Sequence, residues 1–208
     1  IPFGDATPWS MVVTGDDEWN ATYTPTSCVG GFSGSQSIYL KSDFAEKPSD
    51  SNTIERIGYE YNSNGFNDAL PLGTFTVWMA NSDLTEFTDA SQWLDETTMT
   101  QVFSGPVTLY PGTGNMLSLQ LDTPFEYDPT KSLVVCAQQE GSVDPEFAAL
   151  WRVFNWGGAR NRSLRFWTPK SSRTFCEASA AALFVGFKQN LSGIEEVNGN
   201  AAGNVYYN

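Results

Sequence analysis

The sequence predicts an all-β fold, a two-sheet antiparallel sandwich that is jelly-roll-like. Three observations support this prediction: apolar and polar residues alternate with a period of two in many short segments, turn-forming residues separate these segments, and no helical period is sustained. Many short strands with regular turns are typical of a sandwich. The 208 residues lie within the range of one such domain.

At least nine strands are expected. They cover residues 37–40, 57–61, 74–80, 102–110, 117–121, 133–137, 150–156, 163–167 and 181–187. Side chains two positions apart share a face of a strand, so six residues of two segments should meet in one core: Phe75, Val77, Met79, Leu117, Leu119 and Leu121. Residues 133–137 are apolar on both faces and should form a central strand, and one short helix is expected around residues 90–97.

A single domain is expected over residues 1–192, followed by a tail at 193–208. The tail is rich in Asn, Gly and Ala, which indicates an extended or disordered end. No apolar run approaches the ~20 residues that span a bilayer, so membrane insertion is not expected.

The net charge of −13 opposes binding to nucleic acid or to anionic membranes, because both present negative charge. Such a charge keeps a protein soluble, as expected outside a cell. The three cysteines, Cys28, Cys136 and Cys176, allow one disulfide and one free thiol, or three free thiols.

The chain contains no histidine, which excludes Ser-His-Asp and Cys-His pairs and leaves too few ligands for a classical zinc site. We therefore expect no enzyme. A glycosidase with two carboxylates stays open, although most acidic residues occupy turn-like stretches and are more simply solvated loop charges. No cofactor is expected; a structural calcium ion bound by Asp16, Asp17 and Glu18 is the one alternative to a solvated acidic turn.

Tryptophan is abundant, and two regions are candidates for ligand binding. Trp78 lies on the face opposite Phe75, Val77 and Met79, so it points outward or into a second layer. An exposed indole is a flat apolar plate on which a sugar ring can stack; the alternative is a Trp covered by a loop.

The second region is residues 151–173, with six of the eleven basic residues and three of the seven Trp. Gly157-Gly158 predicts a hairpin between two aromatic strands. The candidate ligand-binding residues here are Trp151, Trp156, Arg165 and Trp167. If Leu164 and Phe166 face the core, Arg165 and Trp167 point outward together, joined by one of Trp151 and Trp156; the alternative is a hairpin whose arginines pair with nearby carboxylates.

Several short segments follow one another in a recognisable order along the chain: 37–40 (SIYL), 54–59 (IERIGY), 74–80 (TFTVWMA), 87–89 (FTD) with Trp93, 102–105 (VFSG), 119–127 (LQLDTPFEY) and 133–135 (LVV). This order resembles the jelly-roll accessory domains of secreted Bacteroidetes proteins, loosely related to cleaved-adhesin and choice-of-anchor domains. Residues 194–197 (IEEV) and 204–208 (NVYYN) resemble the start of their C-terminal secretion tail. The aspartate-rich calcium loop of gingipain adhesin modules is not evident.

The resemblance implies a secreted or cell-surface, non-catalytic accessory module within a larger multidomain chain. With the aromatic residues above, it leads us to expect an extracellular glycan as the ligand. The alternatives are a structural spacer or an adhesin domain that binds a surface protein, and, more remotely, a paired-carboxylate glycosidase.

Overall fold

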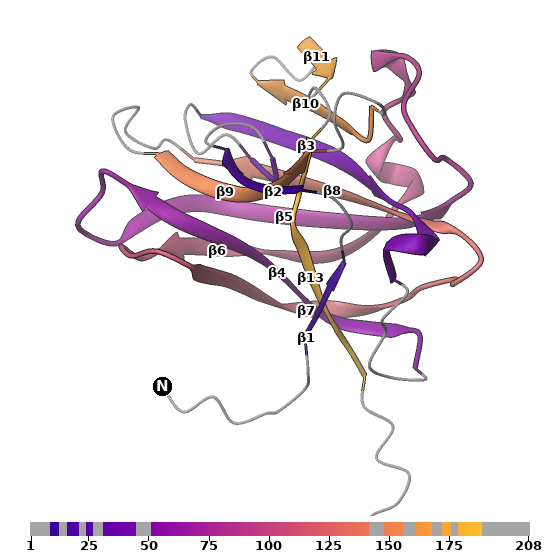
Figure 1. Ribbon diagram of the computed structural model, residues 1–208, viewed down its shortest axis with the longest axis horizontal. Helices are drawn as coiled ribbons and strands as arrows, with labels where there is room; N and C mark the ends of the chain where they lie inside the picture. The colour runs from indigo at the N-terminus through magenta and orange to yellow at the C-terminus, as the bar shows by residue number, and fades with distance from the viewer. Residues whose placement is uncertain are drawn as a thin grey trace, which may run out of the picture.

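A computed structural model describes residues 9–12, 16–20, 24–26, 31–44, 51–141, 148–155, 161–167, 172–175 and 179–188. These residues form two antiparallel sheets that pack together as a β-sandwich (Figure 1). The fold class predicted from the sequence is therefore confirmed. The predicted tail at 193–208 lies outside the described residues, as do Cys28 and Cys176.

The first sheet has seven strands in the order β1-β13-β4-β9-β12, with β2 paired to β9 and β7 paired to β4. Their bounds are β1 Trp9–Val12, β2 Asp16–Asn20, β4 Thr53–Asn64, β7 Asn115–Glu126, β9 Ala148–Asn155, β12 Ser179–Ala181 and β13 Leu183–Phe187. Each of the nine predicted segments overlaps a strand, in this sheet or the other, but residues 181–187 are divided at Ala182 between the end of β12 and β13. The strands β1 and β2 were not predicted.

The second sheet has six strands in the order β11-β10-β3-β8-β5-β6. Their bounds are β3 Phe32–Tyr39, β5 Leu70–Ser82, β6 Thr100–Leu109, β8 Ser132–Glu140, β10 Ser163–Trp167 and β11 Ser172–Phe175, the last not predicted. Figure 1 shows β10 and β11 at the top of the view, beside β3. The strand β8 pairs with both β3 and β5, which confirms the predicted central strand.

No α-helix occurs among the described residues, but three 3₁₀ turns do: η1 (Lys41–Phe44), η2 (Ala90–Gln92) and η3 (Glu96–Thr98). The last two stand where one short helix was predicted. Asp89 and Asp95 cap them, since each side chain accepts a hydrogen bond from a backbone N–H two residues on. Each cap starts a new turn, so the segment forms two short turns and not one continuous helix.

The main core lies between the sheets, and the six residues predicted to meet there do so. Phe75, Val77 and Met79 of β5 are fully buried in one cluster with Leu117, Leu119 and Leu121 of β7. The alternation in these two strands thus identified the inward faces correctly.

A second core covers the outer face of the six-stranded sheet. The segment between β5 and β6 folds over this face, and its buried Phe87 and Trp93 pack on residues of three strands. These are Ile38 of β3, Val134 and Cys136 of β8, and Leu164 and Phe166 of β10. The Gln36 side chain fixes the segment, donating to the Leu94 carbonyl at 2.6 Å and accepting from the Leu94 N–H at 2.9 Å. The apolar residues on both faces of β8 are therefore explained by two cores, one on each side.

The predicted hairpin of residues 151–167 is wrong. β9 pairs with β4, β2 and β12 in the first sheet, whereas β10 pairs with β3 and β11 in the second. The chain therefore crosses between the sheets here. Turn residues show that a chain reverses, but they do not specify which strands pair across the turn.

Gly73 occupies a position that other residues cannot adopt without strain. Its φ is +80°, and a Cβ added there would collide with the backbone carbonyl of Glu140 on β8 and lie 2.8 Å from the Gly141 Cα. We expect Gly73→Ala to lower the free energy of unfolding by more than about 1 kcal/mol, measured by urea denaturation. Gly31→Ala, where a Cβ meets nothing within 4 Å, is the control and should change it by less than about 0.5 kcal/mol.

No helix within the described residues is long and apolar enough to cross a membrane.

Candidate binding pocket

A pocket opens at one end of the six-stranded sheet, where β3 and β5 end and β8 begins. Because β8 runs antiparallel to both neighbours, the C-terminal ends of β3 and β5 meet the N-terminal end of β8. The cavity volume is about 260 Å³. Its lining comes from three separate segments: Leu40, Lys41 and Ser42; Ser82, Asp83 and Thr85; and Thr130, Lys131 and Ser132.

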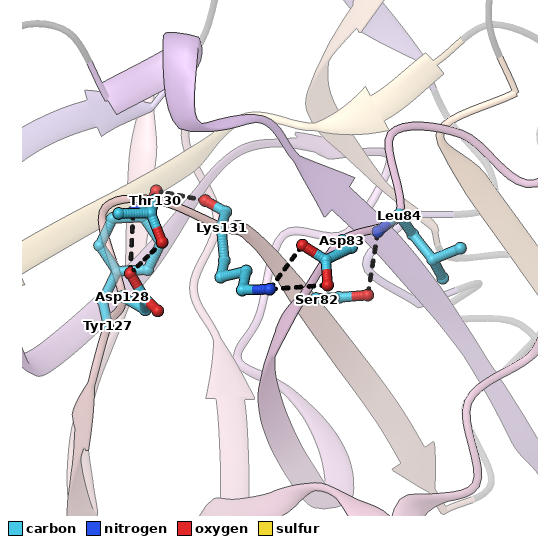
Figure 2. A network of polar contacts seen from close by, with 7 residues as sticks. All are labelled: Ser82, Asp83, Leu84, Tyr127, Asp128, Thr130 and Lys131. Carbon is cyan, nitrogen blue, oxygen red and sulfur yellow. Dashed lines mark hydrogen bonds and ion pairs between the residues drawn. The ribbon is translucent and has the colours of Figure 1, made fainter.

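The strand register places an ion pair in this pocket. Ser82 is paired with Ser132 in the β5–β8 ladder, so Asp83 and Lys131 occupy the next opposed positions. The Lys131 Nζ lies 2.6 Å from both Asp83 carboxylate oxygens (Figure 2). This hydrogen bond raises the pKa of Lys131 above its usual value, so the ammonium stays charged at neutral pH. The side chains are 36% and 84% exposed, so the pair contributes little to stability.

The turn that carries Lys131 is held by Asp128. The Asp128 Oδ1 accepts from the Thr130 N–H at 2.9 Å and from the Thr130 hydroxyl at 2.7 Å (Figure 2). These hydrogen bonds lower the pKa of Asp128, so it is ionised at neutral pH. The Tyr127 hydroxyl donates to the Lys131 carbonyl, and burial, with the negative charges of Asp128 and Asp43, raises the pKa of Tyr127 to about 12. Tyr127 therefore remains a neutral donor.

The opposite wall is η1, which is held by a buried ion pair. The Asp43 Oδ2 accepts from the Arg162 Nη1 at 2.7 Å and from the Leu40 N–H at 2.8 Å. The two charged side chains are 1% and 5% exposed. Phe44 stacks on the Tyr127 ring with centroids 4.5 Å apart. The backbone of Lys41 is thereby fixed, although its side chain is exposed.

Most of the residues that line the pocket carry a side-chain hydrogen-bonding group. Two ammonium groups donate, the Asp83 carboxylate accepts, and five hydroxyls can do both: Ser42, Ser82, Thr85, Thr130 and Ser132. The Ser82 hydroxyl already accepts from the Leu84 N–H at 3.2 Å (Figure 2). Such a site suits a small molecule that carries several hydroxyls.

Two of the predicted binding tryptophans are covered. Trp151 is fully buried in the main core, and its Nε1 donates to the Thr26 carbonyl at 3.1 Å. The prediction that Trp151 lines a binding surface is wrong, because both faces of β9 carry aromatic residues and alternation alone does not reveal the inward one. Trp78 is half-buried and packs against the second core, as in the loop-covered alternative.

The other predicted residues lie on β10 or just before it. Leu164 and Phe166 are buried, as expected, but in the second core on the outer face of the sheet. Arg165 is opposite Ser35, on the face that turns toward the other sheet; it is half-buried, and its Nε lies 3.4 Å from the Thr174 hydroxyl. Its predicted outward direction is therefore wrong. Trp156 and the Trp167 side chain lie outside what the structure describes, so their roles stay predictions.

Cys136 is a buried cysteine in the thiol form, and its Sγ lies 4.0 Å from the Glu96 Oε1, which also accepts from the Trp93 Nε1 at 3.0 Å. These contacts fasten the segment over the second core. Among the described residues, no group of three or more His, Cys, Asp or Glu could hold a metal ion. Asp16, Asp17 and Glu18 lie in β2 and not in a turn; their side chains are not described, and calcium binding there stays a prediction.

The residues that define the pocket were missed by the sequence analysis. Lys41, Asp83 and Lys131 are far apart in the chain and belong to no motif. The sequence did show that each of these residues lies near the end of a predicted strand. Only the order of the strands in the sheet brings the ends of β3, β5 and β8 together. Searches against models of known protein families and against curated proteins find no match for this sequence.

Proposed function

We propose that this chain is a non-catalytic binding domain of a secreted or cell-surface bacterial protein, and that its ligand is an extracellular carbohydrate. The observation that supports this proposal is the pocket, whose lining includes five residues with hydroxyl groups, one with a carboxylate and two lysines. Sugar hydroxyls donate and accept hydrogen bonds, so they match this mixture of groups. The two walls are fixed in advance by the Asp128 turn and by the Asp43–Arg162 pair, which limits the entropy lost on binding.

Two features of the pocket favour binding over hydrolysis. Asp83 is the one carboxylate among the described lining residues, and a glycosidase uses two. A serine–lysine pair would need a neutral lysine as the base, whereas the raised pKa of Lys131 keeps it protonated. The glycosidase alternative therefore gains no support from this site.

Filling the pocket tests the proposal. Thr85 is exposed on the pocket wall, so Thr85→Trp should block the cavity without disturbing the core. Oligosaccharides that bind the wild-type protein on a glycan array should lose at least about tenfold in affinity, measured by calorimetry, with an unchanged Tm. Thr108→Trp, at an exposed position of β6 that does not line the pocket, is the matched control and should bind normally. Wild-type protein that binds no glycan, or equal binding by both variants, would reject the pocket as the site.

A structural spacer or protein-binding adhesin domain is the second candidate. It is favoured by the covered aromatics, since Trp93 and Trp151 are buried and Trp78 lies against the second core. A spacer exposes no aromatic side chain on which a sugar ring could stack. A glycan array on which the wild-type protein binds no glycan would favour the spacer or the protein-binding domain.

The surface predicted around β10 has its own test. Trp167→Ala, with and without Arg165→Ala, separates a second glycan contact from a packing role. Lost binding at an unchanged Tm would support a contact, whereas a large fall in Tm would place Trp167 in the core.

A further inference from the structure

We infer that the sugar bound in this pocket is acidic, with Lys41 contacting its anionic group. The inference rests on the proposed function, because it names the class of carbohydrate for the same site. Its basis is the pairing of the charged residues that line the pocket, which within the described chain are Lys41, Lys131 and Asp83. Asp83 is bonded to Lys131 through both oxygens, so that pair is internally neutral.

Lys41 supplies the uncompensated positive charge. The part of the chain that the structure describes offers its ammonium no ionic or hydrogen-bond partner. Of the carboxylates that hold the two walls, Asp43 is paired with Arg162, and the ionised Asp128 acts on Lys131. The Lys41 ammonium is therefore a positive group with no carboxylate partner among the described residues, on a chain whose overall charge is −13.

The overall negative charge does not cancel this local one. At physiological ionic strength, exposed charges farther apart than about 8 Å are largely screened, so the distant acidic residues of the chain act only weakly on Lys41. An anion on the ligand would complete the pairing of Lys41, while the ring hydroxyls would meet Ser42, Thr85 and Ser132. With a neutral sugar bound, the Lys41 ammonium would have no anionic partner and would stay hydrated.

The anion can be a carboxylate, as in a uronic acid, or a sulfate ester. Lysine is a point charge on a flexible stem and pairs with both, so the shared chemistry is a polyhydroxylated ring with one negative group. The experiment must distinguish these two sources, and it must also distinguish failure of this inference from failure of carbohydrate binding itself.

Calorimetric titration with three oligosaccharides of matched linkage tests the inference: a uronic acid oligomer, its neutral parent and a sulfated form of that parent. We expect an acidic form to bind the wild-type protein at least about tenfold more tightly than the neutral parent, with an affinity that falls as salt is added. Preference for the uronic acid or for the sulfated form identifies the anion.

Variants of Lys41 then assign the contact. Lys41→Gln should remove the preference for the acidic form, Lys41→Arg should keep most of it, and Lys188→Gln, at an exposed position outside the pocket, should leave it unchanged. Equal binding of acidic and neutral forms would overturn the inference and leave the proposed function standing. Binding of none of the three, with no other glycan bound on the array, would overturn both, and an acidic preference that survives in Lys41→Gln would overturn the role of Lys41.

Discussion

Asp43→Asn is expected to lower the free energy of unfolding by about 3–5 kcal/mol, because it removes one partner of a buried ion pair. The Asp43 and Arg162 side chains are 1% and 5% exposed, and their Nη1–Oδ2 distance is 2.7 Å. An asparagine can still accept from the Leu40 N–H, so the substitution removes the charge and little else. It removes the negative charge that Asp43 places beside the buried Arg162 guanidinium, and weakening the pairing of a buried charge is costly.

The Asp43–Arg162 pair joins three parts of the fold, so its loss should destabilise all three. Asp43 belongs to η1, Arg162 directly precedes β10, and the Arg162 carbonyl accepts from the Ile38 N–H of β3 at 2.8 Å. Urea denaturation followed by tryptophan fluorescence measures the change in stability. The double variant Asp43→Leu/Arg162→Met should cost less than Asp43→Asn, because no charge is left buried.

The exposed Asp83–Lys131 pair is the control. Asp83→Asn breaks an ion pair whose carboxylate side chain is 84% exposed, so it should lower stability by no more than about 1 kcal/mol. If Asp43→Asn costs as little as Asp83→Asn, the Asp43–Arg162 pair does not hold η1 in place, and the Lys41 wall is not fixed as described.

Trp151→Ala is expected to lower the free energy of unfolding by about 3–5 kcal/mol. The indole is fully buried between the sheets, where its ring meets Tyr59 at a centroid distance of 6.3 Å and Tyr61 at 5.7 Å. Truncation removes these contacts and leaves a cavity that the surrounding strands cannot fill. It also leaves the buried Thr26 carbonyl without its indole donor.

Thermal melting together with urea denaturation measures this effect. Trp151→Phe keeps most of the apolar volume and loses the N–H, so it should cost less than Trp151→Ala. Tyr110→Ala removes an aromatic ring that is 62% exposed and should change stability by no more than about 0.5 kcal/mol. An unchanged Tm in Trp151→Ala would show that Trp151 is not part of the core.

Local alternation was sufficient to predict the class of the fold and much of its core. The period of two in β5 and β7 follows from the geometry of a strand, so it revealed that Phe75, Val77 and Met79 would meet Leu117, Leu119 and Leu121. The double-sided apolar run of β8 likewise predicted a central strand, because a strand buried on both faces has no solvent side.

Where one strand carried aromatic residues on both faces, alternation did not indicate which face points inward. Trp151 and Phe154 of β9 are both buried, although they point to opposite faces, and the predicted surface site at Trp151 failed for that reason. The two glycines after β9 predicted a reversal of the chain, yet β9 and β10 belong to different sheets, because pairing depends on contacts with strands distant in sequence.

The sequence by itself determined that this chain is a β-sandwich, which segments are its principal strands, and which chemistry it lacks for want of histidine. The tertiary structure alone decided where the candidate site lies. Lys41, Asp83 and Lys131 are up to ninety positions apart in the chain, and they meet because β8 lies between β3 and β5 in the second sheet. Strand order is set by the summed burial of both sheets and not by any local pattern, so no local reading of these residues could have brought them together.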